Sequence, residues 1–63
     1  MNPKKYKLVD SYEGYVIVGF YSTLQAAKQA ADDFRRETDG ECSLTLFRWS
    51  DTYSAYVTEM LFP

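Results

Sequence analysis

A seven-residue pattern that occurs twice constrains the fold of this chain more than any other feature. Residues 10–16 read DSYEGYV and residues 51–57 read DTYSAYV, so the pattern returns 41 positions later. Just upstream, the aromatic-basic-apolar triplet at residues 6–8 is matched by a similar triplet at residues 47–49. Self-similarity at a fixed interval indicates one supersecondary unit used twice. The repeat predicts two related β-hairpins.

The local patterns predict four strands and one helix in the order ββαββ. Strands are expected over residues 5–9, 15–21, 42–49 and 53–61, which are rich in β-branched and aromatic side chains. Asp10 is expected to accept hydrogen bonds from backbone amides in the first turn. The predicted fold is a single α+β domain over residues 1–63, with a four-stranded antiparallel sheet and one helix packed on one face.

The helix has the clearest sequence signals. Its apolar residues fall on one stripe at helical spacing: Leu24, Ala27, Ala31 and Phe34. Ser22 followed three residues later by Gln25 has the form of a capping box, which predicts a helix beginning near Thr23. Asp39 and Gly40 are expected to end it, because glycine readily adopts the left-handed conformation of a C-terminal cap.

Chain direction and the repeat together allow two strand orders, 1-2-4-3 and 2-1-3-4. The first order is preferred, because Lys5 and Lys7 suit an edge strand. The apolar run at residues 16–18 suits a central strand.

A chain of 63 residues buries only about 60% of the surface that its unfolded form exposes, so its stability is marginal. Cys42 is the single cysteine, which excludes an internal disulfide and fits a reducing, cytoplasmic compartment. The chain must therefore rely on its eleven aromatic residues, or on association with a partner. No signal peptide or membrane span is expected.

The strands are apolar on both of their alternating sides, although one helix can cover only one face of the sheet. The uncovered face is therefore expected to present large side chains. The predicted partner-binding residues are Tyr15, Ile17, Tyr21, Phe47, Trp49 and Tyr56. Two interpretations stay open: amphipathic tyrosines with their hydroxyls in water, or an interface with a second copy (a homodimer) or another protein.

Chain direction also gathers acidic residues at one pole, beside the negative end of the helix dipole. The predicted acidic patch comprises Asp10, Glu13, Glu37, Asp39, Glu41 and Glu59. These carboxylates either form a solvated, capping end of the molecule or meet a basic groove on a partner. The second interpretation predicts an inhibitor of the type encoded by phages and mobile elements, which occupies a nucleic-acid-binding or catalytic groove.

Several function classes are disfavoured by what the sequence contains. The chain has no histidine, so it has no Ser-His or Cys-His pair, and no motif identifies a metal, phosphate or cofactor site. The net charge of −2 disfavours nucleic-acid binding, although stacking of a single strand on the aromatic face is a third hypothesis. We expect a non-enzymatic protein-interaction module without cofactor or metal.

Overall fold

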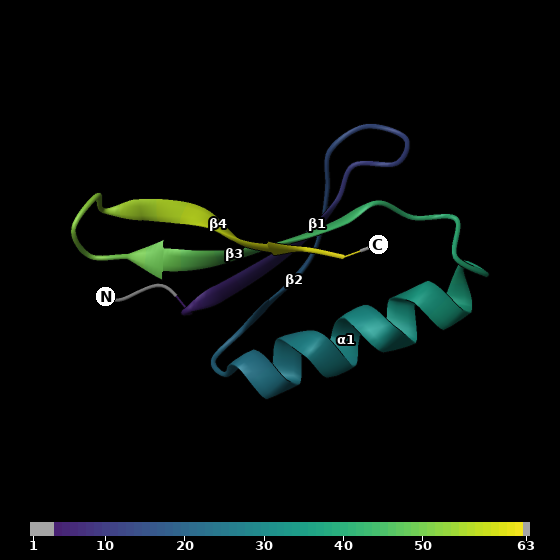
Figure 1. Cartoon of the computed structure of the whole chain (residues 1–63), viewed down its shortest axis with the longest axis horizontal. Coiled ribbons are helices and arrows are strands. Elements are labelled where there is room, and N and C mark those ends of the chain that lie inside the picture. Colours follow the sequence, from purple (N-terminus) through teal and green to yellow (C-terminus); the bar gives the residue numbers. More distant parts are fainter. Residues whose placement is uncertain (1–3, 63) are drawn as a thin grey trace.

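The computed structural model describes residues 4–62 as four strands and one helix. In chain order these are β1 (Tyr6–Asp10), β2 (Val16–Tyr21), α1 (Leu24–Glu37), β3 (Leu44–Ser50) and β4 (Ala55–Leu61). The strands form one antiparallel sheet, and α1 lies along one side of it (Figure 1). The predicted α+β class and the ββαββ order are confirmed.

The helix begins one residue later than the capping-box pattern implies. Thr23, not Ser22, is the N-cap: its backbone is extended, and its Oγ1 accepts a hydrogen bond of 3.1 Å from the Ala26 amide. At the other end, the Gly40 amide donates to the Arg35 carbonyl at 2.8 Å, and Gly40 adopts a φ of +81°. With 14 residues and a polar outer side, α1 is too short and too polar to cross a membrane.

The strand order is β2-β1-β3-β4, so the preferred order 1-2-4-3 is wrong and the alternative is found. The burial of the strand residues explains why this strand order is adopted. The central strands β1 and β3 hold Leu8, Val9, Leu44 and Leu46, all at most 2% exposed. In β2, by contrast, Val16 and Ile17 are about half exposed, as suits an edge.

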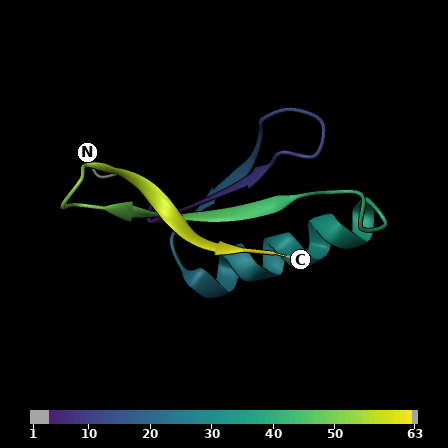
Figure 2. The same ribbon diagram turned by 45° about the horizontal axis from the view of Figure 1, so that its top comes forward.

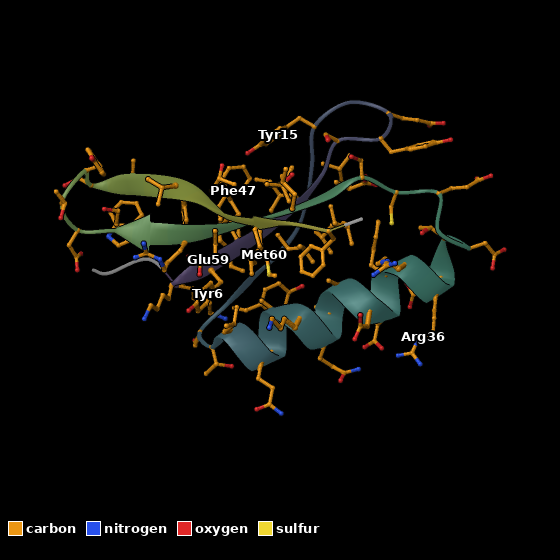
Figure 3. The ribbon with its side chains drawn as sticks, in the orientation of Figure 1. Tyr6, Tyr15, Arg36, Phe47, Glu59 and Met60 are labelled. Carbon is orange, nitrogen blue, oxygen red and sulfur yellow. The ribbon has the colours of Figure 1, made fainter. Side chains whose placement is uncertain are left out.

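The main core lies between the sheet and α1. Ala27 and Ala31 are fully buried on the predicted helical stripe, and their small side chains let α1 approach Leu8 and Leu46 closely. Tyr6 and Met60 also lie between the sheet and the helix (Figure 3). The turn between β1 and β2 stands away from α1 in both ribbon views (Figures 1 and 2).

Within the stretch where it pairs, each edge strand has one residue more than its neighbour. In β2 the pairing passes from Gly19 to Ile17, which leaves Val18 without a partner. In β4 it passes from Met60 to Thr58, which leaves Glu59 without one. These are β-bulges, and each reverses the alternation of side chains beyond it.

The repeat therefore holds for the second strand of each hairpin but not for the first. The two bulged residues, Val18 and Glu59, have the spacing of the repeated pattern. The upstream triplets are not equivalent, however. Tyr6 belongs to the buried core on the helix side, whereas Phe47 pairs with Lys7 on the opposite face. The triplet similarity is thus wrong as a guide to structure.

Candidate functional site

The side of the sheet away from α1, here called the open face, is lined mainly by large apolar side chains. Residues that pair directly across neighbouring strands point to the same face of the sheet. The strand register therefore defines the rows of side chains on the open face. One row is Ile17, Val9, Thr45 and Leu61; the next is Phe20, Lys7, Phe47 and Thr58; a shorter third row is Trp49 and Tyr56.

The bulges change the membership of this face from that predicted. Tyr21 was expected here, but it packs against the core on the helix side, where its ring lies over Gly19. Phe20 takes its place on the open face, because the extra residue Val18 shifts the alternation by one. The bulge at Glu59 likewise turns Met60 towards the core and Leu61 outward.

Lys7 lies near the centre of the open face among aromatic rings. Its Nζ is 4.8 Å from the ring centroid of Tyr56 and 5.0 Å from that of Phe47. The same nitrogen is 5.9 Å from the Tyr15 ring and donates a hydrogen bond of 3.2 Å to the Tyr15 hydroxyl. Cation–π contacts of this kind contribute about 0.5–1 kcal/mol each at exposed sites. The lysine thus joins aromatic side chains from three segments of the chain.

Tyr56 extends over β3 from the edge strand β4. Its ring packs edge-on against Trp49, with centroids 5.2 Å apart, and lies 6.1 Å from the ring of Phe20 on the opposite edge strand. Its hydroxyl donates a hydrogen bond of 2.7 Å to the carbonyl of Lys4. The indole of Trp49 is held in turn by a 3.0 Å hydrogen bond to Asp51. These contacts fix the middle of the open face.

The open face has a covered centre and an exposed rim. Val9 is only 2% exposed although it lies on this side, so neighbouring side chains of the same face cover it. The exposed apolar rim consists of Tyr15, Ile17, Phe20 and Leu61, with exposed fractions between 44% and 72%. Of the predicted residues, Phe47, Trp49 and Tyr56 are half-buried on this face, and Tyr15 and Ile17 belong to its rim.

Sequence reasoning missed Phe20, Leu61 and Lys7 as members of this site. Strict alternation placed Phe20 and Leu61 on the wrong side of the sheet. The one sequence signal of a bulge is Gly19, because glycine is common beside bulges. Lys7 was interpreted as an edge-strand charge, although β1 is central.

Five of the six predicted acidic residues gather as expected. An open hollow of about 490 Å³, between the β1–β2 turn and the C-terminal end of α1, is lined by eight residues, five of them acidic: Asp10, Tyr12, Glu13, Val16, Glu37, Thr38, Asp39 and Glu41. No basic side chain lines this acidic hollow. Glu59 is the exception, because its bulge lies within the sheet, where its carboxylate pairs with Arg48 at 2.9 Å.

Asp10 has a structural role within the acidic hollow. Its Oδ1 accepts hydrogen bonds from the Tyr12 amide at 3.0 Å and from the Ser43 amide at 2.9 Å. The carboxylate thus ties the first turn to the chain entering β3, and its predicted bond to the turn is confirmed. Within residues 4–62, no group of three or more histidine, cysteine or acidic residues is arranged to hold a metal ion.

No protein-family model matches this sequence, and no curated protein or solved structure matches it.

Proposed function

We propose that this protein is a small, non-enzymatic interaction module that binds a partner protein through its open face. The observation that carries the proposal is the exposed rim of Tyr15, Ile17, Phe20 and Leu61 around half-buried Phe47 and Tyr56. A contiguous apolar patch on a small domain favours burial against another surface. Aromatic side chains are also enriched at the centres of protein interfaces.

The rigidity of the centre supports the same proposal. Tyr56 is held at both ends, by its hydroxyl bond to Lys4 and by its ring contacts with Trp49 and Phe20. A surface that is already ordered loses little side-chain entropy on binding. We place the module in the cytoplasm, because its one thiol, Cys42, is free.

The test compares the partners captured by the wild-type protein and by an Ile17→Ser/Phe20→Ser variant. Both replaced side chains belong to the exposed rim, so the variant should lose the Phe20–Tyr56 contact but remain folded, as judged by circular dichroism. A matched control, Gln25→Ser/Gln29→Ser, changes two exposed residues on the outer side of α1. We expect a partner that the wild type and the control retain and the rim variant loses. Identical captured proteins for all three would refute the proposal.

A second candidate function has its own observation. Five carboxylates and no basic side chain line the acidic hollow, beside the negative end of the α1 dipole, although Arg35 and Arg36 lie in the last turn of that helix. Such a surface suits an inhibitor that occupies the basic groove of a nucleic-acid-binding or catalytic protein. It predicts a partner whose binding weakens at high salt and is lost with Glu13→Lys/Asp39→Lys/Glu41→Lys. Salt-independent binding by that triple variant would exclude this candidate.

A further inference from the structure

Lys7 is the feature of the open face that says most about what binds there. Among the residues that the four strands contribute to this face, it is the one that carries a full charge. Two acidic side chains lie beside these rows: Glu59 is paired with Arg48, and Asp51 accepts the hydrogen bond of the Trp49 indole. The face is therefore apolar with a single cation near its middle.

The Lys7 ammonium has hydrogen-bonding capacity left over. An ammonium group carries three N–H donors, and one of them is used, by the Tyr15 hydroxyl. No carboxylate of residues 4–62 lies within 4.0 Å of Lys7 Nζ. The aromatic contacts from Phe47 and Tyr56 stabilise the charge without accepting a conventional hydrogen bond.

A partner that covers this face removes water from the Lys7 ammonium and so changes the free energy of its charge. A partner that excludes water from Lys7 without supplying an acceptor leaves a desolvated ammonium, which is unfavourable. A carboxylate in the same position gives a charge-assisted hydrogen bond in a site of low dielectric. Charge complementarity thus requires an anionic group in the middle of the bound surface.

A second copy of this chain does not meet that requirement. If two open faces met about a two-fold axis, each Lys7 would face strand residues that carry no acid, and the acid beside this face, Asp51, already accepts the hydrogen bond of the Trp49 indole. Two like charges would then be enclosed together. A nucleic acid would supply anions, but its phosphates would be repelled by the net charge of −2 and by the acidic hollow.

We infer that the occupant of the open face is a segment of a different protein that places an Asp or Glu carboxylate against Lys7 Nζ. Large apolar side chains on either side of that carboxylate cover the rim at Ile17, Phe20 and Leu61. This inference rests on the proposed function and specifies its partner chemistry: an acidic residue flanked by apolar ones.

The test selects a displayed library of random peptides against the wild-type protein, a Lys7→Gln variant and a Lys7→Glu variant. Peptides that bind the wild type should be enriched in an acidic residue between apolar residues. Selection on Lys7→Glu should instead enrich a basic residue at that position. Lys28→Gln is the matched control, because Lys28 is exposed on α1, on the other side of the sheet from the open face.

A double-mutant cycle with the selected consensus peptide then measures the contact directly. Replacing the acidic residue of the peptide by its amide should weaken binding to the wild type by roughly tenfold or more. The same replacement should have little effect on binding to Lys7→Gln, because the partner charge is already absent. The effect of the peptide replacement is measured on the wild-type protein, so that result stands even if a Lys7 variant folds poorly.

The outcomes separate this inference from the proposed function. Peptides that need Ile17 and Phe20 but show no acidic preference would overturn the inference and leave the proposed function intact. If no selected peptide depends on Ile17 and Phe20, both fail. A dimer in light scattering that Phe20→Ser dissociates, or displacement of the peptide by a single-stranded oligonucleotide, would identify a different occupant and also overturn the inference.

Discussion

The hydroxyl of Tyr56 lies 2.7 Å from the carbonyl oxygen of Lys4, so a residue of the edge strand β4 is bonded to the chain that enters the central strand β1. The Tyr56 side chain thus reaches across β3, and its ring lies 4.8 Å from Lys7 Nζ. The two hairpins are thereby joined on the face that has no helix. The open face is a stabilising element of the fold as well as a candidate interface.

Tyr56→Phe should therefore reduce stability, although a phenyl ring fills the same space. Loss of one hydrogen bond should lower the free energy of unfolding by about 0.5–1.5 kcal/mol in urea titrations. Tyr53→Phe is the control, because Tyr53 is 74% exposed and its hydroxyl makes no hydrogen bond within residues 4–62. Equal effects of the two replacements would show that the bond to Lys4 contributes nothing.

Leu46→Ala should have a much larger effect than Leu61→Ala. Leu46 is fully buried between the sheet and α1, and its truncation should cost about 2–5 kcal/mol. A domain of this size has a total stability of roughly 3–9 kcal/mol, so the truncation should remove a large share of it. Leu61 is 72% exposed, and the same truncation there should change stability by less than about 0.5 kcal/mol. Thermal unfolding followed by circular dichroism distinguishes the two, and similar midpoints would contradict the burial of Leu46.

The element types were predictable because each rests on a local signal. Apolar spacing identified the stripe of α1, and the run of β-branched residues identified β2. The open face was predictable in kind, because a single helix cannot cover strands that are apolar on both sides. Its exact membership was not. A bulge shifts every later side chain to the other face, and neither Val18 nor Glu59 is of a residue type that identifies a bulge.

Strand order escaped prediction for a different reason. Both orders satisfy the chain connections, so only side-chain preferences could separate them. A lysine at position 7 indicates an edge strand, but on the central strand β1 its ammonium lies over the rings of Phe47 and Tyr56. The buried pairing of Leu8 with Leu46 outweighs such surface preferences, and it depends on contacts distant in sequence.

Thr23→Ala should destabilise the helix, and Ser22→Ala should not. The Thr23 hydroxyl accepts the hydrogen bond from the Ala26 amide, and loss of an N-cap costs about 1 kcal/mol. Thr23→Ser keeps the acceptor and should restore most of that stability. Chemical denaturation of the three variants would decide between the two adjacent hydroxyls. A larger effect at Ser22 would support the capping-box alignment that the sequence suggested.

Asp10→Ala and Glu13→Ala should change the free energy of unfolding by different amounts or in opposite directions, although both residues line the acidic hollow. Asp10 accepts bonds from the amides of Tyr12 and Ser43, so its truncation leaves two donors to find water and should cost about 1–3 kcal/mol. Glu13 is exposed, and removing it lessens the repulsion among the remaining carboxylates, so stability should be unchanged or slightly higher. Asp10→Asn retains an oxygen acceptor and should recover part of the loss. If Asp10→Asn were as damaging as Asp10→Ala, the negative charge, and not the acceptor geometry, would be what joins the first turn to β3.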